Sequence, residues 1–279
     1  MKKTFTLNNG VKIPQIGFGT WQLEEGAETT NAVLTALTSG YDHIDTALVY
    51  GNEKSVSQGL KASGRKREDV FITSKMFNDV LTYDEAMTAI ETSLKNLEVE
   101  YIDLYLIHWP NPITVRDNWE KRNAELYRAL EDMYQAGKLK AIGVSNFWVH
   151  HLEALKKTWR VKPQVNQIFI TPGTVKQDVI DYCFENNILI EAYSPLGRGH
   201  VLESPLMQEL SLKYQKSPAQ LAINWCLSEG YLPLVRSVTK SRIIENLEVY
   251  DFKIAAEDLE KIRNLPGSLK YLSPDERNY

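Results

Sequence analysis

The segment Gly17-Phe18-Gly19-Thr20-Trp21-Gln22 decides between the two folds that the rest of the chain allows. It begins like the G-x-G-x-x-G turn of a Rossmann fold, but Gln22 stands where the third glycine belongs. In a Rossmann fold this turn opens directly into a helix, whereas here we expect it to lead into a loop. We therefore exclude a dinucleotide-binding sheet of that kind.

On either side of this segment, short apolar runs rich in β-branched residues alternate with amphipathic stretches. The runs predict strands at residues 16–19, 41–45, 70–74, 102–107, 141–144, 164–167, 189–192 and 232–235. Helical patterns separate them, at residues 27–38, 53–63, 83–97, 118–135, 150–157, 175–186 and 218–228. Strict alternation of strand and helix implies parallel strands joined by helical crossovers.

A doubly wound open sheet and a closed eight-stranded barrel both satisfy this alternation. The number of strands and the length of 279 residues favour the barrel, which typically takes about 250 residues. Residues 4–7 and 11–13 flank the turn dipeptide Asn9-Gly10 and predict a hairpin before the first strand. No Pro-, Gly- or Ser-rich linker divides the chain. We expect an α/β fold, a (β/α)8 TIM barrel with an N-terminal β-hairpin, as one domain over residues 1–279.

The composition excludes several classes of protein. Lys plus Arg number 32 against 36 for Asp plus Glu, and this net charge of −4 is not that of a general nucleic-acid-binding protein. No apolar window is long enough to span a bilayer, and no apolar core follows Lys2-Lys3 as in a secretory signal. Cys183 and Cys226 are isolated, which indicates buried thiols in a reducing compartment. We expect a cytoplasmic monomer without a membrane or nucleic-acid partner.

Polar side chains follow most of the predicted strands. They are Asp45, Lys75, His108, Ser145, Asn146, Gln167, Tyr193, Ser194, Arg236 and Ser237, and Tyr50 comes shortly after Asp45. In a barrel all these positions meet at the C-terminal rim, where active sites are built from the βα-loops. A single residue of this kind is more often a turn or capping residue. Their recurrence at most strand ends predicts a functional rim.

Asp45, Tyr50, Lys75 and His108 together form a set suited to general acid catalysis. A tyrosine hydroxyl with a pKa of about 10 donates a proton poorly at neutral pH, unless a nearby cation lowers that pKa. Lys75, held and kept charged by Asp45, can be that cation, and His108 can orient a carbonyl oxygen. The set can protonate a carbonyl oxygen as hydride reaches the carbon, and a cofactor must supply the hydride.

A basic turn follows the last predicted strand. Residues 236–242 contain Arg236, Lys240 and Arg242 together with hydroxyl side chains, at the start of a short predicted helix. Helix N-termini attract anions, and barrels often bind phosphate at this place. Arginine suits a monophosphate such as the 2′-phosphate that distinguishes NADP from NAD. The alternative is an ordinary basic surface turn.

Other chemistries fit the sequence less well. The histidines, at positions 43, 108, 150, 151 and 200, form neither H-x-H nor H-E-x-x-H, so we predict no metal site. The nucleophile elbow G-x-S-x-G of the hydrolases is also missing from the sequence.

Over essentially its whole length the chain resembles the aldo-keto reductases. The motifs that carry the resemblance are GFGTW at 17–21, GYDHIDTA at 40–47, YGNE at 50–53, ITSK at 72–75, DLYLIHWP at 103–110, GVSNF at 143–147, NQ at 166–167 and AYSPLG at 192–197. The resemblance implies a barrel that binds NADPH without a Rossmann fold. It also implies a catalytic tetrad of Asp45, Tyr50, Lys75 and His108, with Tyr50 as the acid.

The resemblance further implies a cofactor site that runs across the rim. Ser145, Asn146 and Gln167 would hold the nicotinamide carboxamide, Tyr193 would stack on the ring, and Thr20, Trp21 and Asp45 would lie in the same half of the site. Ser194, Leu196 and Gly197 would follow the pyrophosphate, and Arg236, Ser237, Val238, Thr239, Arg242, Glu245 and Asn246 would enclose the adenosine end. Trp21, Tyr50, His108 and Trp109 would contact the substrate, whereas Phe77, Phe147 and Trp148 are explained equally well by core packing.

The tail from residue 265 to 279 is short and polar, and it resembles that of small bacterial members. We expect an open pocket and a broad NADPH-dependent reductase of methylglyoxal, aromatic and aliphatic aldehydes and keto sugars. A dedicated 2,5-diketo-D-gluconate or ketose reductase is an alternative, and a non-catalytic cofactor-sensing module is another. Val235-Arg236 replaces the Pro-Lys common in the family. NADPH is still favoured, but its selectivity over NADH stays open.

Overall fold

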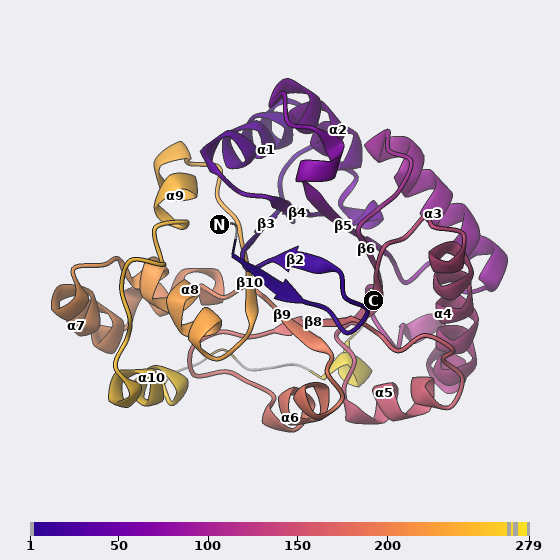
Figure 1. The fold of residues 1–279 in the computed structure, drawn as a ribbon. Coiled ribbons are helices and arrows are strands. Elements are labelled where there is room, and N and C mark those ends of the chain that lie inside the picture. The colour runs from indigo at the N-terminus through magenta and orange to yellow at the C-terminus, as the bar shows by residue number, and fades with distance from the viewer. Residues whose placement is uncertain (1–2, 267–268, 270–272, 278–279) are drawn as a thin grey trace.

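The computed structural model describes residues 3–266, 269 and 273–277, which form a closed barrel of parallel strands (Figure 1). The barrel strands are β3 (Gly17–Gly19), β4 (His43–Asp45), β5 (Phe71–Met76), β6 (Leu104–Ile107), β7 (Ile142–Ser145), β8 (Val165–Phe169), β9 (Leu189–Tyr193) and β10 (Leu232–Val235). Each strand pairs with the next in sequence, and β10 closes the ring by pairing with β3. The predicted barrel is confirmed.

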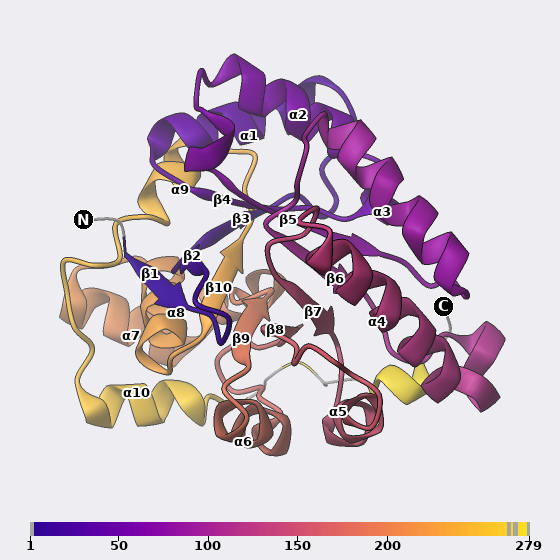
Figure 2. The ribbon, with the colours of Figure 1, turned by 45° about the vertical axis from the view of Figure 1, so that its right-hand side comes forward.

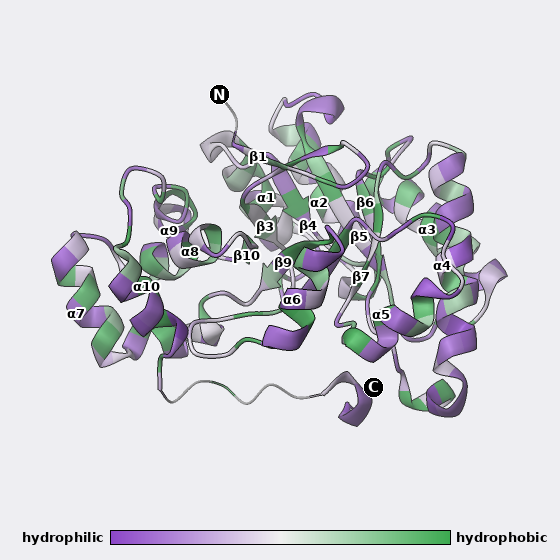
Figure 3. Ribbon diagram, turned by 60° about the horizontal axis from the view of Figure 1, so that its bottom comes forward, coloured by the Kyte–Doolittle hydropathy of each residue, from purple (hydrophilic) through white to green (hydrophobic). Residues whose placement is uncertain are grey.

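Helices surround the barrel on its outside (Figure 2). They are α1 (Ala27–Ser39), α2 (Glu53–Ala62), α3 (Tyr83–Leu97), α4 (Trp119–Gln135), α5 (Val149–Lys156), α6 (Gln177–Glu185), α7 (Pro205–Tyr214), α8 (Pro218–Ser228), α9 (Lys240–Glu245) and α10 (Ala256–Arg263). The sequence patterns missed α7 and α10; of the apolar side chains, α7 buries Met207 and Leu210, and α10 buries Ile262. Figure 3 shows hydrophobic and hydrophilic residues along the same helices, as expected of helices with one packed face.

Short 3-10 helices occupy several of the connections. They are η1 (Leu48–Tyr50), η2 (Arg67–Asp69), η3 (Ile113–Asn118), η4 (Gly197–Glu203) and η5 (Pro274–Glu276). Within the described part of the chain, no helix is long and apolar enough to cross a membrane.

The predicted hairpin forms and closes one end of the barrel. Strands β1 (Thr4–Thr6) and β2 (Lys12–Pro14) pair antiparallel, with Phe5 opposite Ile13. Ile13 is fully buried in a cluster that contains interior barrel residues such as Leu104 and Val165. Among the described residues this end of the barrel is filled by side chains, and the strands terminate at the other end.

The glycines of the opening segment serve packing inside the barrel. A Cβ atom on Gly17 would lie 2.5 Å from a side-chain carbon of Leu234 and 2.7 Å from Nδ1 of His43. Gly17 therefore makes room for a buried histidine of the adjacent strand, and the segment continues into the loop that we expected instead of a helix.

Candidate active site

The carboxyl ends of the strands surround a cavity of about 820 Å³. The cavity is lined by most of the predicted site residues, namely Trp21, Asp45, Tyr50, His108, Trp109, Ser145, Asn146, Gln167, Tyr193, Ser194, Leu196, Arg236 and Arg242. Phe77 also lines it. Lys75 lies fully buried beneath the cavity floor.

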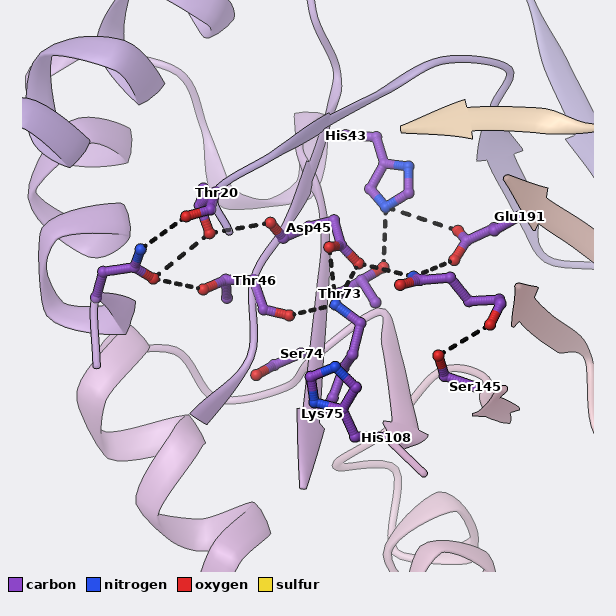
Figure 4. Close-up of polar contacts among 12 residues, drawn as sticks. Thr20, His43, Asp45, Thr46, Thr73, Ser74, Lys75, His108, Ser145 and Glu191 are labelled. Atoms are coloured by element: carbon purple, nitrogen blue, oxygen red, sulfur yellow. Dashed lines mark hydrogen bonds and ion pairs between the residues drawn. The ribbon is translucent and has the colours of Figure 1, made fainter. Parts of the chain in front are cut away.

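Asp45 and Lys75 form an ion pair inside the barrel (Figure 4). Lys75 Nζ donates to both carboxylate oxygens of Asp45, at 2.7 and 2.8 Å, and to the backbone oxygen of Thr46 at 2.8 Å. An ammonium group has three hydrogens, so this geometry uses all of them. The pair is neutral as a unit, which allows both charges to be buried.

Tyr50 and His108 contact each other edge to face on the cavity wall near this pair. Their ring centroids are 5.7 Å apart, and Lys75 Nζ lies 5.2 Å from the centroid of the Tyr50 ring. Burial, together with the carboxylate of Asp45, raises the pKa of Tyr50 well above its ordinary value. The net pKa is therefore raised, and not lowered as expected, because burial and the charge of Asp45 outweigh the stabilisation of the phenolate by Lys75. The phenol is neutral at pH 7.

His108 is also neutral at pH 7. Burial, and then the charge of Lys75, lowers the pKa of this imidazole well below its ordinary value. Nδ1 of His108 is buried and has no hydrogen-bond partner among the described residues. The wall above the ion pair thus presents an uncharged phenol and an uncharged imidazole side by side.

A connected group of polar side chains lies beside the ion pair. Asn146 Nδ2 donates to the backbone oxygen of His108 and to Ser145 Oγ, both at 3.0 Å, and its Oδ1 accepts from the Tyr193 hydroxyl at 2.8 Å. Ser145 Oγ donates to the backbone oxygen of Gln167 at 2.9 Å. Since the donors are used within the protein, the capacity that remains on Asn146 Oδ1 and Gln167 Oε1 is that of acceptors.

The far end of the cavity is cationic. Arg236 and Arg242 line it, and Arg236 also donates to the backbone oxygen of Gln22 at 3.0 Å across the opening. Arg198 lies 5.3 Å from the ring of Trp21, which is 39% exposed. The guanidinium groups of Arg198, Arg236 and Arg242 therefore all line the cavity.

Several predicted residues do not reach the cavity lining. Thr20 is fully buried, and its hydroxyl group donates to the backbone oxygen of Asp45 at 3.1 Å. Asn52, also fully buried, accepts from the Thr46 hydroxyl and donates to the backbone oxygen of Thr20, both at 2.9 Å, so this part of the motif joins loops to strand ends. The others that do not line the cavity are Gly197, Ser237, Val238, Thr239, Glu245 and Asn246, the last five of which lie around α9.

Sequence reasoning missed Arg198, in η4, and Arg277, directly after η5, both of which line the cavity. It also missed His43 and Glu191, two titratable groups that are fully buried inside the barrel. The signal for Glu191 was available, because a glutamate stood in the middle of an apolar predicted strand.

Residues 273–277 bring a polar segment to the cavity. Asp275 Oδ1 is 2.9 Å from His151 Nε2, and Asp275 Oδ2 is 3.1 Å from His150 Nε2. His151 Nδ1 accepts from the backbone N–H of Trp148, so its Nε2 carries the hydrogen and donates to Asp275. These three groups lie as close together as metal ligands. In this structure their contacts join residues 273–277 to α5. The sequence predicted that the tail leaves the pocket open. Of this tail, residues 267–268, 270–272 and 278–279 lie outside the described part of the chain. Arg277, which is described, lines the cavity wall.

Comparison with known proteins matches this geometry to a family. The profile of the aldo/keto reductase family matches residues 15–266. The chain belongs to the aldo/keto reductase family. It is 43% identical over 262 residues to a glyoxal reductase of Bacillus subtilis, covering 94% of this chain and 92% of that one.

Solved structures of reductases resemble this one closely. An aldo-keto reductase from a deep-sea metagenome library superposes with a TM-score of 0.92 at 39% identity, covering 99% of this chain and all of that one. A Bombyx mori aldo-keto reductase in complex with NADP superposes with a TM-score of 0.85 at 31% identity, covering 94% and 92% of the two chains. The family uses NADP(H), and this chain is an NADP-dependent oxidoreductase.

The described residues fit that cofactor. The acceptors on Asn146 and Gln167 suit the N–H groups of a primary carboxamide, and the arginines at the other end of the cavity suit phosphates. The buried Nδ1 of His108, which has no partner among the described residues, marks unsatisfied polar capacity on the cavity wall.

Proposed function

We propose that this aldo/keto reductase reduces small aldehydes and ketones to alcohols with NADPH, and that Tyr50 is the general acid. The observation that carries the proposal is the pair of uncharged rings, Tyr50 and His108, above the buried Asp45–Lys75 ion pair. When bound, NADPH supplies a hydride to the carbonyl carbon. The proton for the carbonyl oxygen must come from the protein.

The Tyr50 hydroxyl is the group that gives this proton. A neutral phenol holds its proton until negative charge develops on the carbonyl oxygen, and Lys75, 5.2 Å from the ring centroid, stabilises the phenolate that remains. Asp45 fixes Lys75 and keeps the site neutral before the reaction. The neutral imidazole of His108 orients the carbonyl oxygen toward the hydroxyl group.

The cavity wall supports small carbonyl compounds as substrates. Trp21, Phe77 and Trp109 give it an apolar part. The relative named for glyoxal reduction supports methylglyoxal as a substrate, together with aromatic and aliphatic aldehydes and keto sugars. The proposal includes a cytoplasmic monomer, and a mass of 31.9 kDa in sedimentation equilibrium is the result that supports the monomer.

A dedicated reductase of acidic sugars, such as 2,5-diketo-D-gluconate, is the second candidate. Arg277 favours it, because a guanidinium group on the wall, 5.6 Å from the Trp109 ring, can pair with a substrate carboxylate. The ratio of kcat/KM for this substrate to kcat/KM for methylglyoxal separates the two candidates.

The test of the proposal is NADPH consumption with methylglyoxal, 4-nitrobenzaldehyde and 2,5-diketo-D-gluconate. We expect turnover of at least one of them, and a loss of kcat of about 10² to 10⁴ in Tyr50→Phe with an unchanged Kd for NADPH. Tyr182→Phe, on the outer helix α6, is the matched control and keeps full activity. Tight NADPH binding without turnover of any carbonyl compound would favour the cofactor-sensing alternative and refute the proposal.

A further inference from the structure

Glu191 is a carboxyl group inside the barrel that the reaction above does not use. It stands in the middle of β9 and is fully buried. Its neighbours of the same parity, Leu189 and Tyr193, pack on the interior cluster, whereas Ile190 and Ala192 pack in the layer under the helices. Because burying a carboxyl group in a barrel interior is costly, the groups around it indicate what it does.

A single side-chain amide connects Glu191 to the catalytic ion pair. Gln167 Nε2 donates to Glu191 Oε2 at 2.8 Å and to Asp45 Oδ2 at 3.0 Å. These two bonds use both hydrogens of the amide nitrogen. The orientation of Gln167 is therefore set by two carboxyl groups, and its Oε1, the acceptor offered to the cofactor, depends on both of them.

The titratable groups around Glu191 are Asp45 and His43 on β4 and Lys75 on β5 (Figure 4). Its Oε1 lies 4.0 Å from His43 Nε2, which bonds the Thr73 hydroxyl at 2.9 Å. Burial, and then the charge of Asp45, raises the pKa of Glu191 to about 8, and burial lowers the pKa of His43 to about 3. At pH 7 Glu191 and His43 are therefore both neutral, and the charges of Asp45 and Lys75 cancel. Ionisation of Glu191 adds one negative charge.

We propose that Glu191 is a positioning residue of the reductase, which holds Asp45 and Gln167 in place through one amide and weakens the proton donor Tyr50 when its carboxyl group ionises. The second effect follows because a negative charge added beside the Asp45–Lys75 pair offsets the cation that stabilises the phenolate. Reduction is then slower at alkaline pH. The inference about Tyr50 rests on the proposed function, whereas the buried state of Glu191 does not.

Two substitutions separate positioning from charge. Glu191→Gln keeps an acceptor for Gln167 but cannot ionise, and Glu191→Leu removes the acceptor. We expect wild-type kcat with 4-nitrobenzaldehyde to fall above about pH 8, and this step to be missing in Glu191→Gln, whose kcat at pH 6.5 stays within about threefold of wild type. Glu191→Leu loses about fivefold to tenfold in kcat at pH 6.5, the value of one hydrogen bond. Glu185→Gln, on the exposed end of α6, is the control.

Thermal unfolding without cofactor gives a readout that is independent of activity. Between pH 4.5, the ordinary pKa, and about pH 8, the folded chain keeps a proton on Glu191 that the unfolded chain has released. The stability of the wild type therefore falls as the pH rises through this window. Glu191→Gln lacks this loss, so its Tm should exceed that of the wild type by several degrees at pH 8 and by much less at pH 5.

Each outcome has one meaning. A wild-type alkaline limb that persists in Glu191→Gln refutes the effect on Tyr50, and wild-type kcat in Glu191→Leu, folded by circular dichroism, refutes the positioning role. A difference in Tm that does not change between pH 5 and pH 8 shows that the pKa of Glu191 is not raised in the folded protein, and overturns the charge argument. If no carbonyl compound is turned over but the Tm difference follows pH as expected, the proposed function fails while the buried acid remains.

Discussion

Lys75→Met is the substitution whose effect on stability follows most directly from the structure. It removes three hydrogen bonds of 2.7 to 2.8 Å and leaves Asp45 in the barrel interior without its cation. Breaking a buried pair by removing one partner costs about 3–5 kcal/mol. For a chain of this size that cost lowers Tm by about 10 °C.

The assay is equilibrium unfolding in urea, followed by circular dichroism, on Lys75→Met, Asp45→Asn and the double variant. The matched control is Lys61→Met, since Lys61 pairs with Glu98 on the surface and both side chains are more than half exposed. We expect this control to lose less than about 1 kcal/mol. The double variant should lose less than the sum of the two single variants by about 1–3 kcal/mol, because the partners share one interaction.

Two results would refute this reasoning. If Lys75→Met lowers the free energy of unfolding no more than Lys61→Met does, the charge of Asp45 is compensated even without Lys75. Strict additivity in the double variant means that the pair is not coupled, and that Lys75 contributes only through its packing.

Three further predictions concern the cavity and one helix. Arg242→Met should raise the Kd for NADPH about tenfold to hundredfold and that for NADH less than twofold, since Arg242 lines the cationic end of the cavity; equal losses in fluorescence titration would show that it does not bind the 2′-phosphate. Arg277→Met should lower kcat/KM for 4-carboxybenzaldehyde about tenfold and leave 4-nitrobenzaldehyde within twofold, and a parallel fall for both substrates contradicts a contact with the carboxylate. Ser217→Ala should cost about 1 kcal/mol in urea unfolding, because its hydroxyl caps α8 by accepting from Gln220 N. Ser204→Ala is the control, since Ser204 precedes α7 without a side-chain capping bond, and an equal loss in both variants argues against the capping bond.

The sequence predicted the part of the fold that repeats, the alternation of strands and helices. Apolar runs and amphipathic stretches predicted the eight strands and most of the helices, because a side chain that must be buried repeats with the period of its element. The same runs placed Asp45 at the end of β4, Ser145 at the end of β7 and Tyr193 at the end of β9. Helices α7 and α10 were missed, although α10 is amphipathic and buries Ile262 on its packed face.

The segment around Gly17 shows where sequence alone was sufficient and where it was not. The missing third glycine excluded the Rossmann turn without any structure. That Gly17 is needed for contact with His43 and Leu234 could be learned only from the packing. Likewise, the family motif suggested Thr20 for the cofactor site, but the barrel buries its hydroxyl against the backbone of Asp45.

The sequence by itself determined the alternation of strands and helices, the family, and which polar side chains stand at the strand ends, since all of these depend on local order along the chain. The tertiary structure decided what those side chains do to one another. Desolvation is a property of the assembled barrel, so only the structure shows that the pKa of Tyr50 is raised and that Glu191 lies two hydrogen bonds from Asp45. It also brings Arg277, which is 41 residues after Arg236 in the sequence, to the same cavity.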